Sequence, residues 1–185
     1  MRHLVIGWIL VLSVGLVSGQ TPEHVPTEDC PMKKAVPASP YSGLEGREIK
    51  ALSDGDREKL LSGHGMGMAL AAELNRFPGP KHVLELADDL GLSTEQVRVA
   101  REIFDEMARQ ARQLGQIVVE KEAQLDDRFA TALIDQEELA RAVREIGQLR
   151  GELRLTHLRA HLQMRAAMND LQIATYDRLR GYRSK

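Results

Sequence analysis

The sequence predicts an all-α fold in which one long antiparallel helical hairpin is flanked by short helices. Two observations predict this. Aromatic residues make up only 4% of the 185 residues and charged residues 28%, a balance more typical of long amphipathic helices than of a β-sandwich or a doubly wound sheet. Apolar residues also recur with a period near 3.5 over two long stretches, each preceded by a side-chain helix cap.

Three helix starts are indicated by their caps. In a capping box, the side chain of the capping residue accepts a hydrogen bond from the backbone N–H three positions later, and the side chain at that position accepts one from the cap's own N–H. Here an apolar residue precedes each cap and can pack on the first turn as a hydrophobic staple. The three pairs are Ser93 with Gln96, Asp135 with Glu138, and Asn169 with Gln172.

The first two caps open the arms of the predicted hairpin, residues 93–131 and 135–167. At 1.5 Å per residue each arm would be roughly 45–60 Å long. Such a thin hairpin has a large surface for its volume, so we expect a homodimer. The predicted seam residues are Ala100, Phe104, Met107, Ala111, Leu114, Val118, Leu125 and Phe129 in the first arm, and Leu139, Ala142, Ile146, Leu149, Leu153 and Ala160 in the second.

Charge is distributed unevenly between the arms. Residues 81–140 carry 14 acidic and 7 basic side chains, whereas residues 141–185 carry 4 and 10. These opposite charges favour docking of one arm on the other. An internal partner therefore explains the basic stretch better than nucleic acid does, and we expect no nucleic-acid binding.

Before the hairpin, four shorter helical segments are predicted. Ser53 with Asp56 can cap the second of them, Pro80 can open the last, and Gly91 can end it. The segments are 44–52, 53–63, the small-residue stretch 65–75, and 80–89.

The beginning of the chain predicts export. Residues 1–19 combine a short positive start, an apolar run of about 14 residues at Leu4–Val17 and small residues before Gln20, which is typical of a cleaved signal peptide. That run is short of the roughly 20 residues that span a bilayer, and no second one follows, so no membrane span is expected after cleavage.

Residues 20–43 contain five prolines and are predicted to be a flexible leader. Cys30 is the only cysteine. Its thiol could bind a metal or form an intermolecular disulfide, but its place in the leader favours a residue with no specific role.

A family resemblance enters at the two caps that contain glutamine. Leu92-Ser93-Thr94-Glu95-Gln96 resembles the Leu-Thr-x-x-Gln motif of the Spy/CpxP family, and Met168-Asn169-Asp170-Leu171-Gln172 resembles a second copy with Met for Leu and Asn for Thr. The resemblance covers residues 85–182. It implies a cradle-shaped dimer of bent hairpins in the bacterial periplasm. It also implies a function as an ATP-independent chaperone, a stress-signalling accessory or a heavy-metal sensor. The helical domain with this fold and function would comprise residues 44–182.

Two groups of side chains are candidate ligands for a transition metal such as Cu, Zn or Ni. Two histidines one helical turn apart can face the same ion, and thioether sulfurs favour Cu(I). In the second group, residues two apart do not share a helix face, so coordination would need a loop. Packing at the edge of the apolar seam is the alternative, and nearby arginines oppose a bound cation. The groups are His157, His161 and Met164, extended by Met168, and His64, Met66 and Met68.

A chaperone would need a shallow mixed surface, on which arginine stems and leucines contact unfolded or stress-related protein clients loosely. The alternative is that these leucines are buried in a dimer and the arginines meet the acidic arm. The candidates are Arg154, Leu158, Arg159, Leu162 and Arg165.

No catalytic motif is recognisable. The chain has no nucleophile elbow, phosphate-binding glycine loop or His-Glu-x-x-His pair, and acids such as Glu102 have the spacing of a solvated helix face. We therefore expect a binding protein of the chaperone class rather than an enzyme. A periplasmic metal sensor or metal-sequestering protein and a structural or signalling adaptor are the other hypotheses.

Overall fold

The computed structural model describes residues 38–182, and those from Ser39 onward form one compact unit. The predicted signal peptide, most of the predicted leader and Cys30 lie outside the described residues. Within them, the elements are a short 3-10 helix and six α-helices. In order these are η1 (Leu44–Gly46), α1 (Asp54–Ser62), α2 (Leu70–Glu73), α3 (Pro80–Glu85), α4 (Thr94–Ala130), α5 (Gln136–Ala167) and α6 (Asp170–Leu179).

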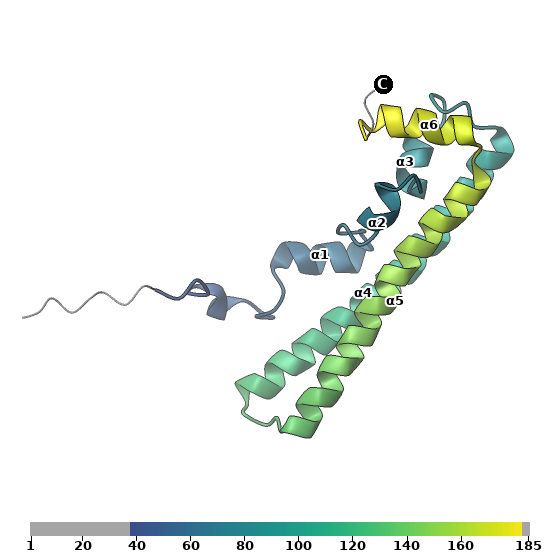
Figure 1. Cartoon of the computed structure of the whole chain (residues 1–185). Coiled ribbons are helices and arrows are strands. Elements are labelled where there is room, and N and C mark those ends of the chain that lie inside the picture. Colours follow the sequence, from purple (N-terminus) through teal and green to yellow (C-terminus); the bar gives the residue numbers. More distant parts are fainter. Residues whose placement is uncertain (1–37, 183–185) are drawn as a thin grey trace, which may run out of the picture. The chain divides into compact units, whose positions relative to one another are not determined.

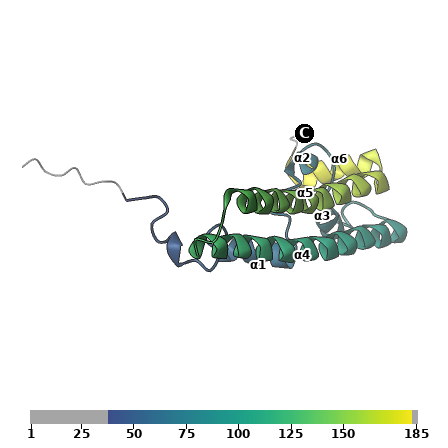
Figure 2. The same ribbon diagram turned by 90° about the horizontal axis from the view of Figure 1, so that it is seen from below.

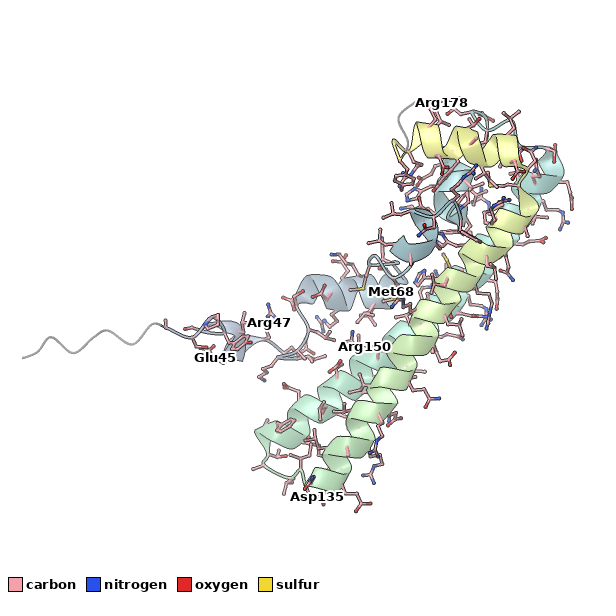
Figure 3. The ribbon with its side chains drawn as sticks, in the orientation of Figure 1. Glu45, Arg47, Met68, Asp135, Arg150 and Arg178 are labelled. Atoms are coloured by element: carbon pink, nitrogen blue, oxygen red, sulfur yellow. The ribbon has the colours of Figure 1, made fainter. Side chains whose placement is uncertain are left out.

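The predicted helical hairpin is confirmed. Helices α4 and α5 run antiparallel and side by side (Figures 1 and 2), and the short connection between them leads to Asp135 at the far end from α6 (Figure 3). Two ion pairs join the arms, Lys121 with Glu145 at 2.8 Å and Arg150 with Glu122 at 2.7 Å. Of these, the Arg150–Glu122 pair joins a base of the second arm to an acid of the first, as the charge distribution predicts, whereas the Lys121–Glu145 pair has the reverse sense. Helix α4 also pairs several of its charges along its own surface.

The seam is well packed along only part of its length. Ala100, Ala111 and Val118 of α4 are fully buried, as is Leu153 of α5. Phe129 is 56% exposed, so its prediction as a seam residue is wrong. Phe129 lies in the last turn of α4, and neither core cluster of the described residues extends to it.

Two of the three predicted capping boxes are complete. Ser93 with Gln96 and Asn169 with Gln172 make both reciprocal bonds. Asp135 accepts from the backbone N–H of Glu138 at 2.8 Å, but the described structure contains no return bond to the Glu138 side chain. That cap is therefore a single N-cap rather than the box that the sequence predicts.

Helix α1 approaches α4 at a glycine. A Cβ added to Gly115 would overlap the carbonyl oxygen and carbon of Leu60, so no other residue fits there without movement of one helix. Leu60 is 1% exposed and belongs to a core cluster with Ala111, Val118 and Leu153. The helix begins at the predicted Ser53 cap and ends at Gly63, whose φ of 73° is the left-handed conformation that terminates helices.

The segments between α1 and α4 are less helical than predicted. Only Leu70–Glu73 is helical in the small-residue stretch 65–75, because Met66 and Gly67 adopt positive φ angles of 46° and 76° and break the helix. Helix α3 starts at Pro80 as predicted but ends at Glu85 rather than near 89. The chain from Gly63 to Pro80 is therefore mostly loop.

Helix α6 closes the end of the hairpin near α3 (Figure 1). Its Ile173 and Tyr176 are fully buried with Val83 and Met164 in a second core cluster. The residues described, 38–182, include no helix long and apolar enough to cross a bilayer.

Candidate functional sites

The two cap glutamines, Gln96 and Gln172, bind each other. The Nε2 of Gln96 donates to Oε1 of Gln172 at 2.9 Å, and the Nε2 of Gln172 donates back to Oε1 of Gln96 at 3.0 Å. Gln96 also donates to the carbonyl of Ala167 at the end of α5, at 2.9 Å. One amide pair therefore holds the start of α4, the end of α5 and the start of α6 together. The sequence predicts each cap but not that the two meet.

Glu73 is a buried carboxylate that ties α2 to α6. It accepts hydrogen bonds from the hydroxyls of Tyr176 at 2.5 Å and Tyr182 at 2.8 Å, and from the backbone N–H of Gly79 at 3.1 Å. Arg180 lies 3.6 Å away. Burial, and then the hydrogen bond to Glu73, raises the pKa of both tyrosines. Three donors and a nearby cation thus compensate this buried negative charge.

A cavity of about 430 Å³ lies beside Glu73, and we call it the central cavity. Its walls come from the loop before α2, from the start of α3, from the middle of α4, from α5 and from the end of the described chain. Four of the side chains predicted as metal ligands line it together, namely His64, Met66, His157 and His161.

The other predicted ligands do not reach the central cavity. Met164 and Met168 are buried in the core cluster beneath α6. Met68 packs on the other cluster, between α1 and the hairpin (Figure 3). The loop that the sequence argument required around Met66 is present, but the loop brings a different subset of residues together from the ones grouped by sequence.

The two histidines of α5 have different environments. The Nδ1 of His161 donates to the carbonyl of Phe77 at 2.8 Å and lies 3.6 Å from Glu73. His157 is 3% exposed, and its buried Nε2 has no hydrogen-bond partner in the structure. Burial, and then the charge of His161, lowers the pKa of His157, so its neutral form is favoured.

The charged residues around the central cavity are mainly cations. Lys81, Arg112 and Arg180 line it, against the single carboxylate of Glu73. Among residues 38–182, no group of three or more His, Cys, Asp or Glu side chains is arranged to hold a metal ion. These observations favour a negative ligand over a positive one.

A second site is an apolar groove on the other side of α2. It has a volume of about 380 Å³, and we call it the α2–α5 groove. Three of the five side chains predicted to bind clients line it. It is lined by Ala71, Ala72 and Phe77 on one side and by Leu155, Leu158, Arg159 and Leu162 of α5 on the other.

The two remaining client-binding candidates lie elsewhere. Arg154 is exposed on α5, outside the residues that line the groove. Arg165 pairs with Asp170 at the start of α6, at 2.9 Å. This pair makes Arg165 part of the α5–α6 junction instead of a free contact surface.

Sequence reasoning missed Glu73, Arg112 and the α2 side of the groove. Glu73 is the only charged residue in residues 65–75, and an isolated acid among small residues was the one available signal. Nothing local distinguishes Arg112 from the other arginines of α4. Phe77 lies in a Phe-Pro-Gly-Pro turn. This motif predicts a break between two helices, but it does not predict which residues the Phe77 ring contacts.

Comparisons of the chain with models of protein families, with curated proteins and with solved structures find no match. The resemblance to the Spy/CpxP family therefore stays a prediction from the two cap motifs.

Proposed function

We propose that this protein is an exported, periplasmic binding protein of the chaperone class, which works without ATP. It holds apolar segments of unfolded or stress-damaged proteins in the α2–α5 groove. The proposal makes it a binding protein rather than an enzyme.

The observation that carries this proposal is the exposed apolar lining of the groove. Leu155 and Leu162 are 42% and 61% exposed on α5, and Leu158 between them is half-buried. A groove of this kind can accept aliphatic or aromatic side chains through the hydrophobic effect without demanding a particular sequence. Such tolerance is what a binder of many unfolded chains requires.

Charge on α5 supports a partner with acidic residues. Arg159 lines the groove, Arg154 is exposed five residues before it on α5 and outside the lining, and neither forms an ion pair within the part of the chain described. Exposed, unpaired guanidinium groups attract carboxylates and lay their apolar stems beside leucines. The preferred client segment is therefore apolar with acidic residues nearby.

The decisive experiment is an aggregation assay on a chemically denatured client, followed by light scattering. The wild-type protein is expected to slow aggregation at equimolar ratio, and Leu162→Asp is expected to lose most of that effect. The matched control is Leu171→Asp, which changes a leucine of α6 that is 77% exposed and lies outside the groove. Both variants should keep the helical circular dichroism spectrum, because neither leucine is buried.

The groove can be occupied either by a client segment or by a second copy of the chain, and the molecular mass in solution distinguishes these two cases. We propose a homodimer, as the thin hairpin suggests, with the groove left open to clients. Light scattering after size exclusion should then give the same mass for the wild type and Leu162→Asp. A dimer that Leu162→Asp splits would show that the groove is the contact between two copies, and a wild type that does not slow aggregation would contradict the chaperone function.

Metal binding is a second candidate function, and one observation favours it. Two histidines from α5 and a histidine and a methionine from the loop before α2 line the same cavity. The surrounding cations oppose it. Calorimetric titration with Cu(I), Zn(II) and Ni(II) tests it, and an absence of micromolar binding would remove the metal-sensor function.

A further inference from the structure

The central cavity has features that client binding in the α2–α5 groove does not use. Its volume of about 430 Å³ lies within the range of roughly 300–1,000 Å³ for small-molecule sites. It is lined by residues far apart in sequence, from Ser62 to Tyr182. The fold, rather than one loop, therefore shapes this space.

One part of the cavity wall is apolar. Phe104, Met107 and Ala108 of α4 contribute to it, together with Met66 and Leu70 from the opposite side. Met66 and Leu70 are 40% and 55% exposed, so apolar surface beside the cavity is in contact with solvent. A ligand with a hydrocarbon body would cover this surface.

Another part of the wall is cationic, and its one acid, Glu73, already has hydrogen-bond donors and a cation beside it. Glu73 accepts from two tyrosine hydroxyls and a backbone N–H and lies beside Arg180. Lys81 lies 3.9 Å from Glu85. Arg112 has no ion-pair partner among residues 38–182. Arg112 is exposed, so its guanidinium is available to pair with an anionic group of a ligand.

His157 adds an imidazole ring to the cavity wall. The Nε2 of this ring is buried without a hydrogen bond. Buried polar groups in folded proteins almost always have partners, and an unmade bond costs free energy. Nε2 itself has no surface open to the cavity, so a ligand oxygen would meet the Nδ1 edge of the ring, which lies toward Gly65 in the cavity wall. A tautomer with the proton on Nδ1 would donate to that oxygen.

From these observations we propose that the central cavity binds a small organic anion with an apolar body, of the class of a medium-chain carboxylate. The carboxylate lies toward Arg112 and His157, and the hydrocarbon chain lies along Phe104 and Met107. This binding site is separate from the client-binding groove and does not depend on the function proposed for it.

The test uses three probes of known charge in isothermal titration calorimetry with the full exported chain. Octanoate has both the charge and the apolar body, octylammonium has the opposite charge, and acetate lacks the body. Octanoate is expected to bind at least tenfold more tightly than either of the others.

Two variants localise the binding. Arg112→Gln is expected to weaken octanoate binding at least tenfold, whereas Arg101→Gln, on the same helix but outside the cavity wall, should leave it unchanged. Gly65→Leu is expected to abolish binding by filling the cavity, since a Cβ at Gly65 would lie 3.7 Å from the Nδ1 of His157, an ordinary contact. Circular dichroism checks that each variant remains folded.

Each alternative outcome is distinguishable. Equal binding of octanoate and octylammonium, or equal effects of Arg112→Gln and Arg101→Gln, would overturn the proposal. Binding of Zn(II) or Cu(I) that Gly65→Leu abolishes, without binding of octanoate, would assign the cavity to a metal instead. Leu162→Asp should not alter octanoate binding, so a failure of this proposal and a failure of the chaperone function can be told apart.

Discussion

Gln96 and Gln172 each use their side-chain amide both to complete a helix cap and to bind the other glutamine. The oxygen of each accepts from the backbone N–H of its own cap, at 3.0 Å in both cases, while the nitrogen of each donates to the other glutamine. Since Gln172 is 7% exposed, the pair is largely shielded from water. Two local motifs have thus become one tertiary contact between the ends of three helices.

Replacement of Gln96 by leucine should destabilise the fold by about 2–4 kcal/mol. The change removes the side-chain donor of the Ala167 carbonyl and one hydrogen bond from both the oxygen and the nitrogen of the Gln172 amide. An unsatisfied buried group costs about 1–3 kcal/mol. Urea unfolding followed by circular dichroism measures the loss. Gln163→Leu, at an exposed position of α5, is the control and should change stability little. A double-mutant cycle of Gln96→Ala and Gln172→Ala should show coupling, and strict additivity would contradict the pairing.

The contact between α1 and α4 predicts opposite effects of the same substitution at two glycines. Gly115→Ala should cost about 1–3 kcal/mol, because the added Cβ overlaps the backbone of Leu60 and the helices must separate. Gly147→Ala, in α5 with nothing within 4 Å of the added atom, should stabilise by about 0.5–1 kcal/mol through helix propensity. Thermal and urea unfolding compare the two. A Gly115→Ala protein as stable as Gly147→Ala would mean that α1 does not dock there.

The buried tyrosine of α6 predicts a loss of stability at alkaline pH. The pKa of Tyr176 is raised by burial and by the hydrogen bond to Glu73. Above the ordinary value of about 10 the unfolded chain therefore releases a proton that the native protein keeps, and stability falls as pH rises. Urea midpoints between pH 9 and 11 should fall steeply for the wild type and less steeply for Tyr176→Phe. Tyr41→Phe, at a side chain that is 73% exposed, should follow the wild type.

His157 predicts the opposite trend on the acidic side. Its pKa lies below the ordinary 6.5 because burial, and secondarily His161, disfavours its charged form. Between 6.5 and that lowered pKa the unfolded chain binds more protons than the native protein, so stability falls as pH falls through this window. His157→Phe should flatten the dependence of the urea midpoint on pH between 7 and 5. His64→Gln changes an exposed histidine and should leave the slope as in the wild type. A wild-type midpoint that does not change with pH there would argue against a buried neutral His157.

Features encoded locally could be read from the sequence. The hairpin arms begin one residue after the predicted caps Ser93 and Asp135, because a cap is chemistry between neighbours three positions apart. The end of α1 at Gly63 was predictable for the same reason. The prediction of a helix over residues 65–75 was wrong because Met66 adopts a left-handed conformation. Few residues other than glycine adopt this conformation, and no local sequence pattern predicts it here.

The arrangement of the sites depends on contacts that the sequence could not show. Periodicity placed His157 and His161 on one helix face, and in the structure both line one cavity. It could not show that the loop with Met66 reaches them, or that Met164 is fully buried instead. Leu158 and Leu162 could be identified as a row of leucines, but not the opposing Phe77, because tertiary docking of a short segment decides that contact.

The hydrogen bond between Glu73 and Tyr176 joins positions 103 residues apart, whereas the hairpin arms are joined by a connection of a few residues. Closing a long chain segment costs more entropy than closing a short one, and contacts near in sequence form sooner. The α4–α5 hairpin is therefore expected to form early during folding. The hydrogen bonds between the Glu73 carboxylate and the two tyrosines are expected to form near the end. Until these bonds form, the segment between α1 and α3 lacks one of its tertiary anchors. A chain whose refolding is interrupted is therefore expected to be helical but to have an incomplete cavity and groove.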